Sequence, residues 1–167
     1  MLKLFKRLFK RANEGTRGEI ANTYNMTVEH FRGGKRLMKQ EIHNIVTSAG
    51  KARDAGLFNG VFTTPFTWLA IGLGTAAAAT GDTALGSEVT TSGGARATAT
   101  CTTATTTVAG DTAQLVKQWD FTGTFAVTES GIFDASTAGN LAARQVFSAV
   151  NVVSGDSLQI TWKMQKS

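Results

Sequence analysis

The strongest constraint on the fold is an alternation of apolar and polar residues, with a period of two, in the second half of the chain. Large apolar side chains occupy every second position of residues 158–164, and residues 119–127 show the same period except at Gly123. Successive side chains of a β-strand point to opposite faces of a sheet, so this period predicts half-buried strands. Further strands are predicted at residues 66–71, 95–108, 130–133 and 143–153, with turns at residues 134–140 and 155–156. Short strands separated by turn residues favour a mainly β fold, either an antiparallel β-sandwich or a small barrel.

One helix is predicted over residues 39–57, because the apolar period changes there to that of a helix. The residues that share its apolar face are Ile42, Ile45, Val46, Ala49 and Arg53. Gly56 and Gly60 stand where a C-terminal glycine would end this helix. Upstream, the adjacent Gly33 and Gly34 predict a tight turn between two short strands. Downstream, residues 72–94 are rich in Gly, Ala and Thr and are predicted to form a long surface loop.

Positive charge is concentrated towards the N-terminus. Residues 1–60 contain twelve Lys or Arg against five Asp or Glu, whereas residues 61–167 contain five against seven, which together give a net charge of +5. A basic segment on a nearly neutral body is typical of an arm that contacts an acidic partner. We therefore divide the chain into a basic N-terminal docking arm, residues 1–40, and a helix plus β-sandwich domain, residues 41–167. Residues 12–40 are polar and interrupted by glycine, so we expect them to lack order in the free protein.

Residues 1–11 have an amphipathic pattern and supply the candidate docking site. Apolar side chains lie on one face of the predicted helix and basic side chains line the other. A helix of this length is not stable alone in water, so it needs a surface to order it. The candidate docking residues are Leu4, Phe5, Leu8, Lys3, Lys6, Arg7, Lys10 and Arg11. We expect them to enter a groove with an acidic rim on a partner protein, and we rank a membrane surface and a nucleic acid behind that partner.

The chain offers little for catalysis or metal binding. His30, His43 and Cys101 lie far apart in the sequence, whereas zinc sites and nucleophilic sites need several such side chains together. The Gly-Leu-Gly-Thr-Ala-Ala motif at residues 72–77 follows a predicted strand, as in a dinucleotide site, but Gly81 soon interrupts it and no parallel-sheet pattern follows. We therefore expect that the chain is not an enzyme and that it binds no cofactor, no metal ion and no small-molecule substrate. Calcium binding by the loop acids Asp82, Glu88 or Asp134 remains an open alternative.

Two further features bear on where such a chain is made. No apolar run approaches the ~20 residues of a membrane-spanning helix, and Lys and Arg interrupt the apolar residues of the N-terminus as they would not in a signal peptide. The single cysteine also allows no disulfide within the chain. We expect synthesis in a cytoplasm.

Three segments of the chain resemble phage virion structural proteins of the tail, fibre, collar and capsid-surface appendage type. They are HNIVTSAGKARDAGLFNG at residues 43–60, TPFTWLAIGLGTAAAATGDTALGSEV at 64–89, and the stretch from FTGTFAVTESGIFDAST to GDSLQITWKMQ at 121–165. The resemblance implies a C-terminal β-sandwich, symmetric homo-oligomers such as a trimer, and no catalytic residues. It also implies a place in the virion, with other virion proteins as partners.

Within this resemblance we expect a capsid-associated decoration or head-fibre-base protein, because an extended basic arm suits an acidic shell. A tail, collar or fibre-base protein is the alternative. Inside the third of these segments, Glu129 is expected to accept hydrogen bonds from the backbone or from Arg144. Such bonds would tie residues 129–133 to residues 141–144.

Overall fold

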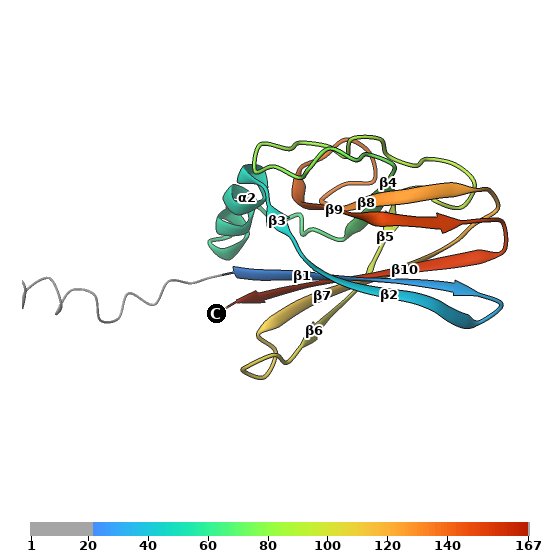
Figure 1. Ribbon diagram of the computed structural model, residues 1–167. Helices are drawn as coiled ribbons and strands as arrows, with labels where there is room; N and C mark the ends of the chain where they lie inside the picture. The colour runs from blue at the N-terminus through green and yellow to red at the C-terminus, as the bar shows by residue number, and fades with distance from the viewer. Residues whose placement is uncertain (1–21, 167) are drawn as a thin grey trace, which may run out of the picture.

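Two antiparallel five-stranded sheets pack face to face, with one helix at one end of them (Figure 1). The computed structural model describes residues 22–166. Sheet A has the order β2 (Lys35–His43), β1 (Asn22–Arg32), β10 (Asp156–Lys166), β7 (Thr112–Asp120) and β6 (Thr100–Ala104). Sheet B has the order β3 (Ile45–Val46), β9 (Leu141–Val152), β8 (Phe125–Phe133), β4 (Trp68–Gly72) and β5 (Ala97–Thr98). The helix is α2 (Ser48–Phe58), so the predicted antiparallel sandwich with one helix is confirmed.

The chain passes from one sheet to the other at both edges of the sandwich, each time through a single residue. Asn44 separates β2 of sheet A from β3 of sheet B, and Ala99 separates β5 of sheet B from β6 of sheet A. Strands that switch sheets in this way form the corners of a sandwich. They also reduce the length of unpaired strand edge, which is the part of a sheet most prone to unwanted pairing.

The core lies between the two sheets and follows the predicted alternation. On β10, Leu158, Ile160 and Trp162 are fully buried, and Met26 and Val28 on the neighbouring β1 fill the same layer. Sheet B closes this layer with Leu69, Ile71, Val127, Ile132, Val150 and Val152. Removing each such side chain from water contributes about 1.5–3 kcal/mol. This layer is therefore the main source of stability for the fold.

The outer faces of the two sheets differ. The segment between β4 and β5 runs over the outer face of sheet B, where Figure 1 shows it in green. Leu85 of this segment packs against Ala70, Phe133 and Leu141 in a second apolar cluster. As a result β8 is buried at every position from Val127 to Phe133. The loop predicted at residues 72–94 is thus present, and it covers the sheet.

Residues 22–40 form ordered strands, so the expected lack of order over residues 12–40 is wrong for this part of the range. β1 and β2 pair as a hairpin whose turn is made by Gly33 and Gly34, at φ values of 55° and 75°, which confirms the predicted turn. Tyr24, Met26 and Val28 are buried and alternate with polar residues, which is itself a strand pattern. Residues 12–21 lie outside the described residues.

Three predicted boundaries are also wrong. Residues 95–108, predicted as one strand, form β5 in sheet B and β6 in sheet A on either side of Ala99. The helix begins at Ser48 rather than at residue 39, because the residues before Asn44 pair with β1 as part of β2. The strand predicted over residues 119–127 is two strands, since β7 ends at Asp120 and β8 begins at Phe125. The apolar alternation continues across this turn because Phe121 and Phe125 return to the same core, with ring centroids 5.9 Å apart.

Candidate docking surface at the helical end

The sandwich has two unlike ends. Asn22, where β1 begins, pairs with Lys166 at the end of β10, and α2 lies at the same end, which we call the helical end (Figure 1). The opposite end, which we call the far end, carries the β1–β2, β7–β8 and β9–β10 turns. The described chain therefore begins, at Asn22, beside α2 and away from those turns.

The helix is held close to β9 by its first turn. Thr47 caps the helix, accepting a hydrogen bond from the Gly50 N–H at 2.9 Å and donating its hydroxyl to the Leu141 carbonyl. A Cβ atom at Gly50 would lie 2.1 Å from the Ala142 carbonyl oxygen, so glycine is required at this contact. Gly50 therefore costs some helix propensity but permits the helix to pack against the sheet.

Residues 59–66 fold back along α2 and enclose Arg53. The guanidinium of Arg53 lies 4.5 Å from the ring centroid of Phe62 and 5.9 Å from that of Phe66. Its Nε also lies 2.8 Å from an oxygen of Asp134. Gly60 follows the helix with a φ of 76°, as predicted for a glycine that ends it, whereas Gly56 lies within α2 and does not end it. The helix and the segment after it thus form one packed unit.

This unit leaves two large apolar side chains in water. Phe58 is 95% exposed and Val61 is 70% exposed. Exposed apolar residues are common singly, but two so close together on one end of a small domain mark a surface suited to contact with another protein.

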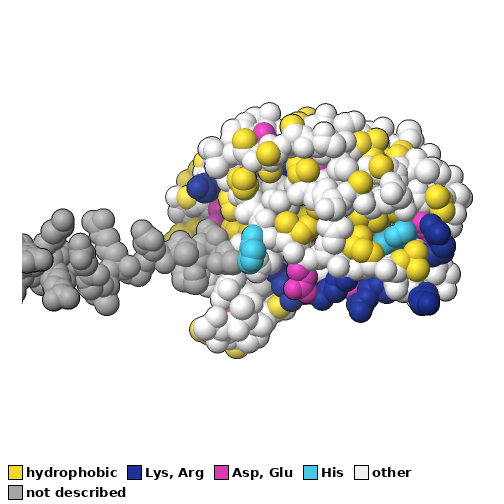
Figure 2. All heavy atoms as spheres, in the orientation of Figure 1, with side chains coloured by type: hydrophobic (Ala, Val, Ile, Leu, Met, Phe, Trp, Pro, Cys, Tyr) yellow, Lys and Arg dark blue, Asp and Glu magenta, His cyan; other side chains and the backbone are white. Residues whose placement is uncertain are grey.

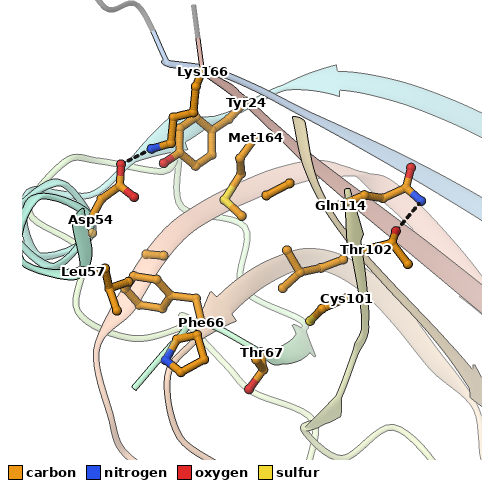
Figure 3. A pocket seen from close by; sticks show the side chains of 15 residues that line it. Tyr24, Asp54, Leu57, Phe66, Thr67, Cys101, Thr102, Gln114, Met164 and Lys166 are labelled. Carbon is orange, nitrogen blue, oxygen red and sulfur yellow. Dashed lines mark hydrogen bonds and ion pairs between the residues drawn. The ribbon is translucent and has the colours of Figure 1, made fainter. Parts of the chain in front are cut away.

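A cavity of about 340 Å³ opens between α2 and β6 at the helical end (Figure 3). Leu57 and Phe66 border it on the helix side, and Leu115, Ala142 and Met164 border it on the sheets. Four of these five residues, all except Leu57, belong to or pack against the main core, so the core reaches the surface here.

Polar groups occupy the mouth of the cavity. Lys166 forms an ion pair with Asp54, and the ring of Tyr24 lies beside this pair in Figure 3. Burial, with a smaller contribution from the negative charge of Asp54, raises the pKa of Tyr24 to about 12. The tyrosine is therefore a neutral hydroxyl at the rim of an otherwise apolar cavity.

A buried carboxylate holds the segment over sheet B in place. Glu129 accepts hydrogen bonds from the N–H groups of Gly74, Gly86 and Ser87, at 2.8, 3.0 and 2.8 Å, and from Arg144 Nε at 2.7 Å. Burial by itself raises the pKa of Glu129, but these hydrogen bonds outweigh burial and lower the pKa overall. The interaction between Glu129 and Arg144 confirms the expectation from the sequence.

The glycine motif at residues 72–77 serves this carboxylate. A Cβ atom at Gly72 or at Gly74 would lie 2.4 Å from Glu129 Oε1, so both positions need glycine. The motif does surround an anion, as in a dinucleotide site, but the anion is a side chain of the same protein. A dinucleotide site also needs a parallel strand pair, whereas β4 is antiparallel to both of its neighbours.

The loop acids considered as calcium ligands are each paired with an arginine. The pairs are Asp82 with Arg144 at 2.8 Å, Glu88 with Arg96 at 2.6 Å, and Asp134 with Arg53 at 2.8 Å. Over residues 22–166, no group of three or more His, Cys, Asp or Glu side chains is placed to hold a metal ion. Within the same residues, no helix has the length and apolar character needed to cross a membrane.

The two histidines and the cysteine lie in different parts of the fold. His30 Nε2 is 2.9 Å from an oxygen of Asp156 at the far end, where Arg32 donates two hydrogen bonds, at 2.6 and 2.8 Å, to the same carboxylate. His43 is exposed at the end of β2, and Cys101 is exposed on β6, where it borders the cavity. These side chains do not combine into a catalytic group.

The eight docking residues predicted from the sequence all lie in residues 1–11, outside the described residues. What sequence reasoning missed is the surface next to them. The exposed Phe58 and Val61 stand in an ordinary helix-to-loop stretch, and the cavity is built from residues scattered over six elements. A local pattern carries no signal for either feature.

Comparison with known proteins gives one match. The family described as "Podophage GP4 fiber I protein gp80" matches residues 46–164, which is more than half of the 167-residue chain. No curated protein and no solved structure matches the chain. The match confirms the resemblance to phage virion structural proteins and a place in the virion. The chain therefore belongs to the podophage fibre family, a family of structural fibre proteins.

Proposed function

We propose that the chain is a non-catalytic fibre subunit that attaches to the phage particle by its helical end and carries the rest of the sandwich outward. The observation behind this proposal is the one-sided placement of contact features. The exposed Phe58 and Val61, the apolar cavity and the start of β1 at Asn22 all lie at the helical end. The far end consists of the short β1–β2, β7–β8 and β9–β10 turns. A subunit of this shape contacts its partner at one end and leaves the other end free.

The charge of the N-terminal residues supports the same direction of attachment. Residues 1–21 contain six Lys or Arg and two Glu. The apolar side chains of Leu4, Phe5 and Leu8 would enter a groove on another virion protein, with the basic residues on its acidic rim. Charge of this kind also speeds the encounter with an acidic surface.

As its place on the particle we propose the head surface, with the tail, collar or fibre base as the alternative. A basic arm suits an acidic protein shell, which is the reason for naming the head first. Residues 22–40 belong to the β1–β2 hairpin, so the length of the arm does not distinguish the head from the tail. The exposed Phe58 and Val61 offer apolar surface for contacts between copies of the chain, and we propose a homo-oligomer, with a trimer as the first symmetry to test.

The test is binding of the purified chain to particles from a phage that lacks its gene, measured by co-sedimentation. A variant with Lys6→Ser, Arg7→Ser and Lys10→Ser should bind about tenfold more weakly, at about 0.5 kcal/mol for each rim charge. Cryo-electron microscopy of the rebuilt particle then shows whether the density lies on the head or on the tail.

A matched control removes the same charge from the far end. Figure 2 shows Lys and Arg side chains gathered at the lower right of the molecule, in the region of β2 and its turn. A variant with Lys35→Ser, Arg36→Ser and Lys39→Ser should bind as tightly as the parent chain. Equal losses in both variants would mean that only net charge matters, and would contradict attachment by the helical end.

A further inference from the structure

The cavity at the helical end has the size and lining of a site for apolar side chains. Its volume is about 340 Å³, whereas an apolar cavity of about 150 Å³ in a protein core accommodates one benzene molecule. About two leucine or phenylalanine side chains would therefore fit. The partly exposed Leu57, Phe66 and Met164 border the cavity, so an apolar occupant would remove their exposed surface from water.

The chain itself has apolar side chains within reach of this cavity. Tyr24 lines the cavity and lies two positions after Asn22, where β1 begins. Fully extended, the chain from Leu8 to Asn22 spans up to about 46 Å, so the apolar face of residues 1–11 can return to the cavity with slack. A link of this length also keeps the two at an effective concentration in the millimolar range. This favours the chain's own residues over those of a neighbouring copy.

We propose that, in the free protein, the apolar face made by Leu4, Phe5 and Leu8 binds over this cavity of the same chain, with about two of the three side chains inside it. An amphipathic segment of eleven residues needs a surface to order it, and this apolar surface is bordered by Tyr24, two positions after the start of β1. The docking residues are then sheltered from water and from self-association until the particle offers a groove. This inference rests on the proposed function for the role of those residues, but the binding itself does not depend on a particle.

Cys101 borders the cavity and is the only cysteine of the chain, so its thiol reports whether the cavity is filled. The experiment measures the rate at which a thiol reagent such as DTNB modifies the full-length chain at fixed pH. A variant with Leu4→Asp, Phe5→Asp and Leu8→Asp should react at least fivefold faster than the parent, because its apolar face no longer binds. The control, with Lys6→Gln and Lys10→Gln on the polar face, should react at the parent rate.

A cross-link distinguishes the chain's own residues from those of a neighbour. In a Leu8→Cys variant, a mild oxidant should join position 8 to Cys101 within one chain, giving a monomer with faster mobility on a non-reducing gel. A cross-linked dimer would overturn the proposal, because the occupant would then come from a second copy. Equal DTNB rates in all three proteins would overturn it as well.

The two proposals fail separately. Protection of Cys101 in a chain that does not co-sediment with particles would contradict the proposed attachment and support the inference made here. Tight binding to particles together with an unprotected Cys101 would support attachment and overturn the binding of residues 1–11 in the cavity.

Discussion

Sheets A and B share one core, but the outer face of sheet A is open to solvent and the outer face of sheet B is covered. The outer face of sheet A presents polar side chains such as Asn25, Thr27 and Thr161. The outer face of sheet B is covered by the segment between β4 and β5, with Leu85 as an apolar plug and Glu129 as a polar anchor. An open face needs only polar residues, whereas a covered face needs a partner for each backbone group that it buries. The buried carboxylate supplies three such partners.

The largest expected change in stability comes from removing one charged side chain from each sheet. Glu129→Gln leaves Arg144 buried beside a neutral amide and should lower the free energy of unfolding by about 3–5 kcal/mol. Glu29→Gln breaks an ion pair with Arg36 on the outer face of sheet A, and should cost less than about 1 kcal/mol. Urea unfolding of both variants checks this, and similar losses in the two would mean that the sheets are equally covered.

Truncation of Leu85 measures how much this apolar contact over sheet B contributes to stability. Leu85→Ala removes a side chain that is 8% exposed over sheet B, and should lower the free energy of unfolding by about 2–3 kcal/mol. Leu37→Ala removes the same atoms from β2, where the side chain is 48% exposed, and should change the free energy of unfolding by about 0.5 kcal/mol or less. The prediction fails if Leu85→Ala is as mild as its control.

A smaller effect is expected from pH. The folded-state pKa of Glu129 is lowered, so its contribution to stability is fully present above the ordinary glutamate pKa of about 4.3 and is lost as the pH falls through the lower folded-state value. The gap in unfolding midpoint between the parent and Glu129→Gln should stay constant from pH 7 to about pH 5 and shrink below that. A gap that widens in acid would show the opposite sign of the shift.

The smallest expected effect is on the open face. Thr161→Val exchanges side chains of similar shape on the outer face of sheet A, and should change the free energy of unfolding of the free chain by about 0.5 kcal/mol or less. The same substitution in assembled fibres measures whether that face stays open. A loss of stability seen only in the assembly would mean that another subunit covers sheet A.

The difference between the sheets also explains what could be read from the sequence. The sequence identifies β10 as a strand because its buried apolar residues alternate with the polar Gln159, Thr161 and Lys163 on the outer face. In β8 both faces are buried, so Glu129 and Ser130 stand next to apolar residues and the period of two is lost. The interaction of Glu129 with Arg144 was foreseen through a family resemblance, not through this pattern.

The strands predicted from the sequence are wrong where one continuous alternation of side chains spans a turn or a change of sheet. Residues 95–108 read as one strand, although the chain moves from sheet B to sheet A at Ala99. Residues 119–127 read as one strand because Phe121 and Phe125 face the same core on either side of a turn. Side-chain period reports which face is buried, and it does not report which strand or sheet the residue belongs to. The cavity, built from six elements, had no sequence signal at all.

The β1–β2 turn has a practical consequence for engineering. A Cβ atom at Gly33 or Gly34 would meet nothing within 4 Å, and the turn lies at the end opposite to α2. With the helical end attached as we propose, a foreign peptide inserted between these glycines would lie at the free end of each subunit, whereas a tag placed before Asn22 would crowd the attached end. The fold is thus a scaffold for presenting antigens or affinity handles on the particle through an internal graft.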